Sequence, residues 1–148
     1  MIQAALDTNV LVRGVLASHP QSASRRVLDA LHQGSFTLLL SPETLVEIER
    51  VLSDESIRAQ HGWSAVDIQR FCAGLQGICR MVMPVTIVPP SLPRDATDAK
   101  WLSLVFDAGA DFLVTHDTKH LGRLKKFGTA AIVTPAAFLR ALARDAAK

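Results

Sequence analysis

The stretch IQAALD (residues 2–7) is a short, mainly apolar run that ends at an acid. Its apolar residues do not alternate with polar ones, which is typical of a strand that is buried on both faces of a sheet. Comparable apolar runs lie at residues 36–40, within 81–88, at 112–115 and at 130–133. Working outward from the first run, we expect a central, mainly parallel five-stranded sheet.

Amphipathic helical patterns separate these runs. Ser41, Pro42 and Glu43 predict a helix start, because serine caps a helix, proline suits its first turn and an acid interacts favourably with its dipole. The strongest helical spacing follows Ser64, at Ile68, Phe71, Cys72, Leu75, Ile78 and Cys79. A further helix is expected over 97–109, whereas 10–16 fits either a strand or a helix. The alternation predicts an α/β fold, a three-layer α/β/α sandwich.

Composition narrows the class of protein. The 148 residues suit a single domain, and 49% of them are hydrophobic, which excludes a disordered chain. No apolar run approaches the ~20 residues that span a bilayer, and no basic segment precedes the first apolar run, so neither a membrane anchor nor a secretory signal is expected. Cys72 and Cys79 lie too far apart on one helix for a disulfide, which favours reduced thiols and a cytoplasmic protein.

Acidic side chains gather at one edge of the expected sheet. Asp7 follows the first strand and Asp117 follows the fourth. Glu47 falls in the second turn of the helix after the second strand, and Asp98 in the first turn of the helix before the fourth strand. No lysine or arginine is obviously placed to neutralise them. Clustered carboxylates repel one another, and a bound Mg²⁺ would remove that cost, so the pattern indicates a metal site.

Each acid alone also has a local explanation. Asp7 and Asp117 could each stabilise a turn, and Asp98 could serve only the helix dipole. Glu43 lies one helical turn from Glu47 and is an alternative ligand. The combination at corresponding positions of the sheet favours a shared site over separate local roles.

Five segments, taken in order along the chain, carry a further signal. They are LDTNVL (residues 6–11), the 41–47 segment, Arg94-Asp95 with Asp98 and Leu102, LVTHD (113–117) and TPAAFL (134–139). Together they resemble the PIN-domain nucleases, and most closely the toxins of bacterial toxin–antitoxin systems. The resemblance covers essentially the whole chain, which implies a single PIN-like domain over residues 1–148. It implies a three-layer α/β/α fold and RNA cleavage that depends on Mg²⁺ or Mn²⁺.

Carried over position by position, the family's acids fall on Asp7, Glu47, Asp98 and Asp117 as catalytic and metal-binding residues. Its supporting polar residues fall on Asn9 and Thr115. The resemblance also implies an RNA substrate, a cognate antitoxin protein and a homodimer. This sequence departs from the family at Lys119, where relatives often have an acid, and around Asp98, where relatives often have a run of acids.

A basic run follows the last acid. His116, Lys119, Arg123, Lys125 and Lys126 could contact RNA phosphates, although a solvated surface explains such a run equally well. His116 and His120 have a spacing that zinc ligands also use, but no glutamate lies between them as in the metalloprotease motif.

Two other functions remain open from the sequence. An inactive PIN-like module would bind RNA or protein without cleaving it. A phosphatase of the haloacid-dehalogenase type also uses an aspartate after the first strand, but it needs a second aspartate where this chain has Asn9.

Overall fold

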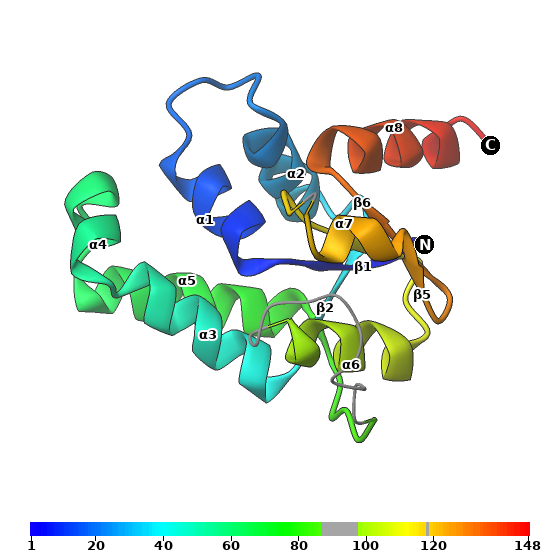
Figure 1. Cartoon of the computed structure of the whole chain (residues 1–148). Coiled ribbons are helices and arrows are strands. Elements are labelled where there is room, and N and C mark those ends of the chain that lie inside the picture. Colours follow the sequence, from blue (N-terminus) through cyan, green and yellow to red (C-terminus); the bar gives the residue numbers. More distant parts are fainter. Residues whose placement is uncertain (87–97, 118) are drawn as a thin grey trace.

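The structure, a computed structural model, describes residues 1–86, 98–117 and 119–148. Its sheet has six strands in the order β3-β2-β1-β4-β6-β5 (Figure 1). The strands are β1 (Gln3–Leu6), β2 (Thr37–Leu40), β3 (Arg80–Met81), β4 (Phe112–Val114), β5 (Lys126–Phe127) and β6 (Ala130–Val133). All neighbouring pairs are parallel except β5 and β6, which are antiparallel.

The first strand lies at the centre of the sheet. β1 pairs with β2 on one side and with β4 on the other, and Ala4 is opposite both Leu38 and Phe112. Ala5 and Leu6 are fully buried. A strand that is covered on both faces needs no polar alternation, which explains the apolar run that predicts it.

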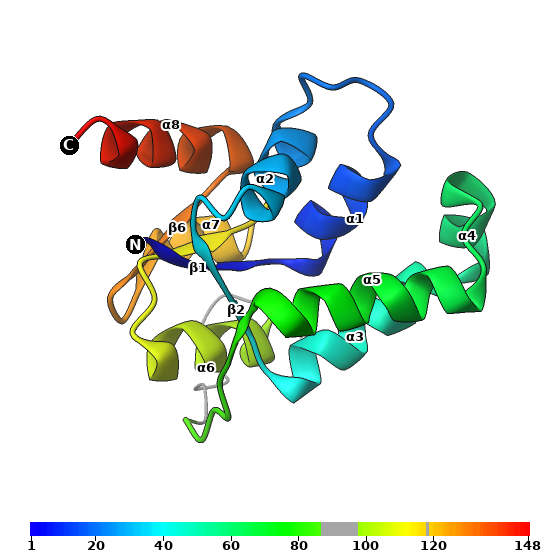
Figure 2. The same ribbon diagram turned by 180° about the vertical axis from the view of Figure 1, so that it is seen from behind.

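Helices cover both faces of this sheet, as expected for a three-layer sandwich. They are α1 (Thr8–Leu16), α2 (Ala23–His32), α3 (Pro42–Leu52), α4 (Glu55–His61), α5 (Ala65–Ile78), α6 (Ala99–Ala108), α7 (Leu121–Leu124) and α8 (Pro135–Ala146). Figures 1 and 2 show α2 and α8 on one side of the sheet, and α3, α5 and α6 on the other. The ambiguous residues 10–16 belong to α1.

Local capping sets the start of two long helices at the predicted residues. Ser41 and Thr44 form a reciprocal capping box at the start of α3, and Ser64 and Asp67 form one at the start of α5. Gly109 ends α6 with a φ of 63°, a left-handed conformation that glycine adopts without strain.

The sheet has one strand more than predicted. β5 is two residues long and carries Lys126, so it leaves no apolar pattern in the sequence. Gly128, with a φ of 59°, helps to connect β5 back to β6. The strand expected within 81–88 is short and begins at Arg80, and residues 87–97, which include part of that expectation, lie outside the described residues.

Other expectations about side chains are partly met. Ile68, Cys72 and Leu75 are buried on α5, but Ile78 at the end of the same helix is 51% exposed. Cys79 is partly buried, and both cysteines are free thiols. Within the described ranges, no helix combines the length and the apolar character that crossing a membrane requires.

Gly14 allows α1 and α2 to pack closely. A Cβ atom added at Gly14 would lie 2.9 Å from the backbone oxygen of Ser24, at the start of α2. Backbone cannot move away as a flexible side chain can, so the space exists only for glycine. This contact sets the separation of the two helices, and α1 begins directly after Asp7.

We expect Gly14→Ala to lower the free energy of unfolding by ~1–3 kcal/mol, because overpacking outweighs the better helix propensity of alanine. Gly74→Ala on α5 is the matched control, since nothing lies within 4 Å of the added methyl group. That control should be neutral or stabilising by up to ~1 kcal/mol. Urea denaturation measures both variants, and a Gly14→Ala protein as stable as Gly74→Ala would contradict the close packing.

Candidate active site

The predicted acids meet in one pocket at the carboxyl ends of the parallel strands. The pocket has a volume of about 400 Å³. It is lined by Asp7, Glu47, Asp98 and Asp117, together with Thr8, Asn9, Arg13, Arg50, Val51, His116 and His120. Ligands of open parallel sheets bind at this edge, because the loops that leave the strands converge there.

Asp7 is the acid of the pocket whose pKa is raised to about 6. It follows β1, and its Oδ2 accepts a hydrogen bond of 2.9 Å from the hydroxyl of Thr115. This rise in the pKa of Asp7 comes chiefly from burial and also from the charges of Asp98 and Glu47, while the hydrogen bond from Thr115 acts to lower the pKa. The carboxylates therefore lie close enough to repel one another.

Glu47, by contrast, is held by three donors. Lys100 Nζ lies 2.8 Å from its Oε1, and the indole N–H of Trp101 donates to its Oε2 at 3.1 Å. The hydroxyl of Thr8 also donates to Oε2. Burial acts to raise the pKa of Glu47, but these donors and the charge of Lys100 lower it overall.

The expectation that no cation neutralises the acids is therefore wrong for Glu47. Lys100 lies on the first turn of α6, directly after Asp98 and Ala99, and reaches Glu47 on α3. Lys100 and Glu47 are 53 residues apart in sequence, and they meet because α3 and α6 pack against each other. The sequence pattern does not reveal that packing.

Asp117 combines a place in the pocket with a local role. Its Oδ1 accepts the backbone N–H groups of Lys119 and His120, each at 2.9 Å. Burial acts to raise the pKa of Asp117, but these backbone hydrogen bonds and the nearby His120 lower it overall. The turn-stabilising role that the sequence allowed is thus present, and the carboxylate still lines the pocket.

Asp98 lies at the N-cap position of α6 and is only 6% exposed. Its side chain makes no capping hydrogen bond to the helix. Asp98 therefore lies buried in the pocket beside Asp7, and its place at the start of α6 also puts it at the positive end of the helix dipole.

Thr115 connects the first and fourth strands at the pocket. Its hydroxyl donates to Asp7 and accepts the backbone N–H of Asp117 at 3.0 Å. Asn9, the other polar residue implied by the resemblance, is exposed on α1 and lines the pocket.

The basic run is divided between the pocket and the surface. His116 lines the pocket, and its Nε2 lies 2.7 Å from the hydroxyl of Ser24. Burial and the charge of Arg13 lower the pKa of His116. The exposed cationic side chains of the run do not line the pocket: Lys119, Arg123, Lys125 and Lys126.

The four acids line one pocket, but their side chains are not arranged as the ligands of a metal ion. Within the described part of the chain, no group of three or more histidine, cysteine, aspartate or glutamate side chains is arranged to hold a metal ion. The contacts explain this, because Glu47 is turned toward Lys100 and Asp117 toward backbone N–H groups.

Two arginines of the pocket were missed by sequence reasoning. Arg13 lies four residues after Asn9 on α1, and Arg50 lies three residues after Glu47 on α3. Helical spacing places each arginine on the same face as a predicted site residue, and this signal could have found them.

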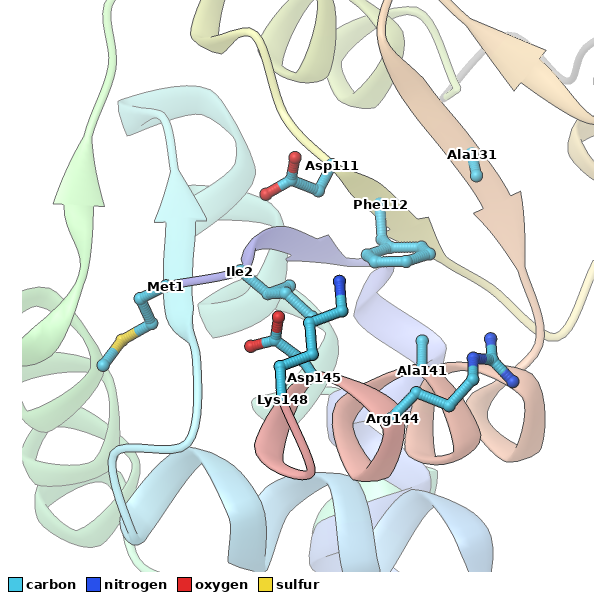
Figure 3. A pocket seen from close by; sticks show the side chains of 9 residues that line it. All are labelled: Met1, Ile2, Asp111, Phe112, Ala131, Ala141, Arg144, Asp145 and Lys148. Atoms are coloured by element: carbon cyan, nitrogen blue, oxygen red, sulfur yellow. The ribbon is translucent and has the colours of Figure 1, made fainter.

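A second hollow lies at the opposite, amino-terminal edge of the sheet (Figure 3). It is larger, at about 680 Å³, and Figure 3 shows Asp111, Asp145, Arg144 and Lys148 around it. Asp111 already accepts the backbone N–H of Gln3 at 2.9 Å. The larger volume does not make it the better candidate, because it lies away from the strand ends at which ligands of parallel sheets bind.

Comparisons with known proteins agree with this architecture. A chain from the crystal structure of VapBC2 from Rickettsia felis, bound to a promoter DNA fragment, is 14% identical, with a TM-score of 0.56. The match covers 90% of this chain and 98% of that one. A chain from the structure of FitAB bound to IR36 DNA is 16% identical, with a TM-score of 0.54, and covers 89% and 94%. These similarities show a shared fold.

A search of curated proteins gave no significant match. The family model of the PIN domain matches residues 3–119, which is most of the chain and spans all of the pocket's acids. The protein belongs to the PIN-domain family.

Proposed function

We propose that the protein is a metal-dependent endoribonuclease that hydrolyses RNA phosphodiester bonds, and that it is the toxin of a type II toxin–antitoxin pair. The observation that carries the proposal is the meeting of Asp7, Glu47, Asp98 and Asp117 in one pocket. The fold shared with the VapBC2 and FitAB chains supports the toxin role and a protein antitoxin as partner.

The pocket fits Mg²⁺ or Mn²⁺ chemically. Asp7 is a partly buried carboxylate whose pKa is raised by desolvation and by its acidic neighbours, and a hard cation would relieve that repulsion. The proposed ligands are Asp7, Glu47, Asp98 and Asp117. Bound there, the cation would stabilise negative charge that develops on phosphate oxygens.

The remaining polar residues would hold these ligands in place. The Thr115 hydroxyl orients Asp7, and Lys100 keeps Glu47 ionised. Asn9 lies at the mouth of the pocket, where it can contact the substrate. The exposed basic run after Asp117 remains a proposed contact for RNA phosphates. A cytoplasmic location is also proposed, which the free thiols of Cys72 and Cys79 fit.

Purified protein should cut total RNA when Mn²⁺ is present and stop when the metal is chelated. Asp7→Asn is the control for contaminating ribonuclease, because it removes one proposed ligand. Intact RNA with Mn²⁺ would favour an RNA- or protein-binding module. Release of phosphate from a monoester through an aspartyl intermediate would favour the phosphatase.

Metal should stabilise the protein, and by more at about pH 8 than at about pH 5, because the ligands must be ionised to bind it. Asp7 has a pKa of about 6 in the folded protein against 3.8 for an ordinary aspartate. The folded protein therefore favours the protonated form of Asp7. The stability that this form provides is fully present below pH 3.8 and is lost as the pH rises through about 6, where the carboxyl ionises.

Asp7→Asn should accordingly raise the Tm of the metal-free protein at about pH 8, change it little at about pH 4, and abolish most of the shift caused by Mn²⁺. Asp117→Asn is the matched comparison, and its effect on Tm should have the opposite sign. The pKa of Asp117 is lowered in the folded protein, so the metal-free variant should be less stable at neutral pH. Melting curves with and without Mn²⁺ measure both. A metal-free Asp7→Asn protein that melts lower at alkaline pH would contradict the repulsion.

Glu47→Gln should reduce RNA cleavage by orders of magnitude, because each ~1.4 kcal/mol of lost transition-state stabilisation is tenfold in rate. Glu43→Gln on the same helix should retain most activity, since Glu43 is exposed and does not line the pocket. Initial rates of RNA cleavage at saturating Mn²⁺, measured for both variants and the wild type, show which glutamate is required. If Glu43→Gln is the inactive variant, the assigned glutamate is off by one helical turn.

Asp98→Asn should also abolish most cleavage, and it has a second readout. The charge of Asp98 raises the pKa of Asp7, so in the metal-free variant the pKa of Asp7 should fall below about 6. Carboxyl NMR follows that titration. Full activity with a stability loss of only ~0.3–1 kcal/mol would instead return Asp98 to a helix-dipole role.

A further inference from the structure

The acidic pocket also has a cationic wall. Arg13 comes from the last turn of α1 and Arg50 from the last turn of α3, and both line the pocket beside Asp7 and Glu47. α1 and α3 pack against each other, so the two arginines belong to adjoining helices. The cationic wall is defined here as Arg13 and Arg50.

Neither arginine of this wall forms an ion pair in the described part of the chain, although the charge of Arg50 helps to lower the pKa of Asp54 at the start of α4. Among the residues that the structure describes, neither guanidinium lies within 4.0 Å of a carboxylate oxygen, whereas Lys100 is paired with Glu47. A basic residue in the last turn interacts favourably with the helix dipole, which explains its charge. The dipole does not explain why both arginines lie on the faces that line the pocket.

We propose that Arg13 and Arg50 bind backbone phosphate groups of the RNA strand in the pocket and position it against the acids. The inference rests on the proposed function and adds the residues that hold the substrate. It assigns them a positioning role and no part in the chemistry of bond cleavage.

Charge explains why such a wall is needed. A phosphodiester is anionic, and the carboxylates of the pocket repel it wherever a cation does not compensate them. Arginine suits phosphate because its planar group donates parallel hydrogen bonds to two oxygens. All four of Arg13, Arg50, Lys119 and Arg123 are exposed, but only the two arginines of the wall line the pocket, which places them closer to the acids than the run that the sequence suggested.

The test measures RNA binding separately from cleavage. A short labelled oligoribonucleotide is titrated with wild-type protein, Arg13→Gln and Arg50→Gln in metal-free buffer, and fluorescence anisotropy is read at several salt concentrations. Arg140→Gln is the control, because Arg140 is exposed on α8, does not line the pocket and carries the same charge. Each pocket variant should bind about tenfold more weakly, with a salt slope smaller by about 0.7.

Arg13→Gln and Arg50→Gln should keep the stabilisation by Mn²⁺, and with Mn²⁺ present their KM for RNA should rise more than their kcat falls. Affinities equal to that of Arg140→Gln, or loss of the Mn²⁺ effect on Tm, would overturn the inference. So would wild-type protein that does not bind the oligoribonucleotide at all. Wild-type protein that binds but never cleaves would refute the ribonuclease while leaving the phosphate contacts supported.

Discussion

The repulsion around Asp7 is the constraint on which the site depends. Asp7 directly follows β1, and pairing of β1 with β2 and β4 fixes the backbone that carries this carboxylate beside the other acids. A partly buried carboxylate near two more is unfavourable for folding, and the raised pKa of Asp7 reflects that cost. The apolar sheet beneath it compensates, as proteins commonly do at functional sites.

The charge in the pocket is distributed unequally. Glu47 is satisfied by Lys100, Thr8 and Trp101, and Asp117 by backbone N–H groups. Asp7 accepts hydrogen bonds from the Thr115 hydroxyl and the Thr8 backbone, but these do not offset the effect of burial and of the neighbouring acids on its pKa. At the proposed metal site, a cation would have to compete with Lys100 for Glu47.

The sequence predicts the framework well and the pairings poorly. Unalternating runs such as residues 2–6 identify the strands because burial on both faces leaves a direct compositional trace. The acids were placed correctly in one pocket because strand ends converge by topology. The pairing of Lys100 with Glu47 and the place of Arg13 in the pocket were not predicted, because the partners of a long side chain depend on the packing of helices that are distant in sequence. The strand β5 was not predicted, because two residues are too few to show a hydrophobic pattern.

The two edges of the sheet have a consequence for how the protein behaves at high concentration. β3 and β5 are each two residues long, and each begins with a cationic residue, Arg80 or Lys126. A short, charged edge offers few free backbone groups and repels an identical edge on another molecule. The apolar strands β2, β1, β4 and β6, each three or four residues long, lie inside the sheet between these two edges. We expect this arrangement to disfavour aggregation through strand pairing.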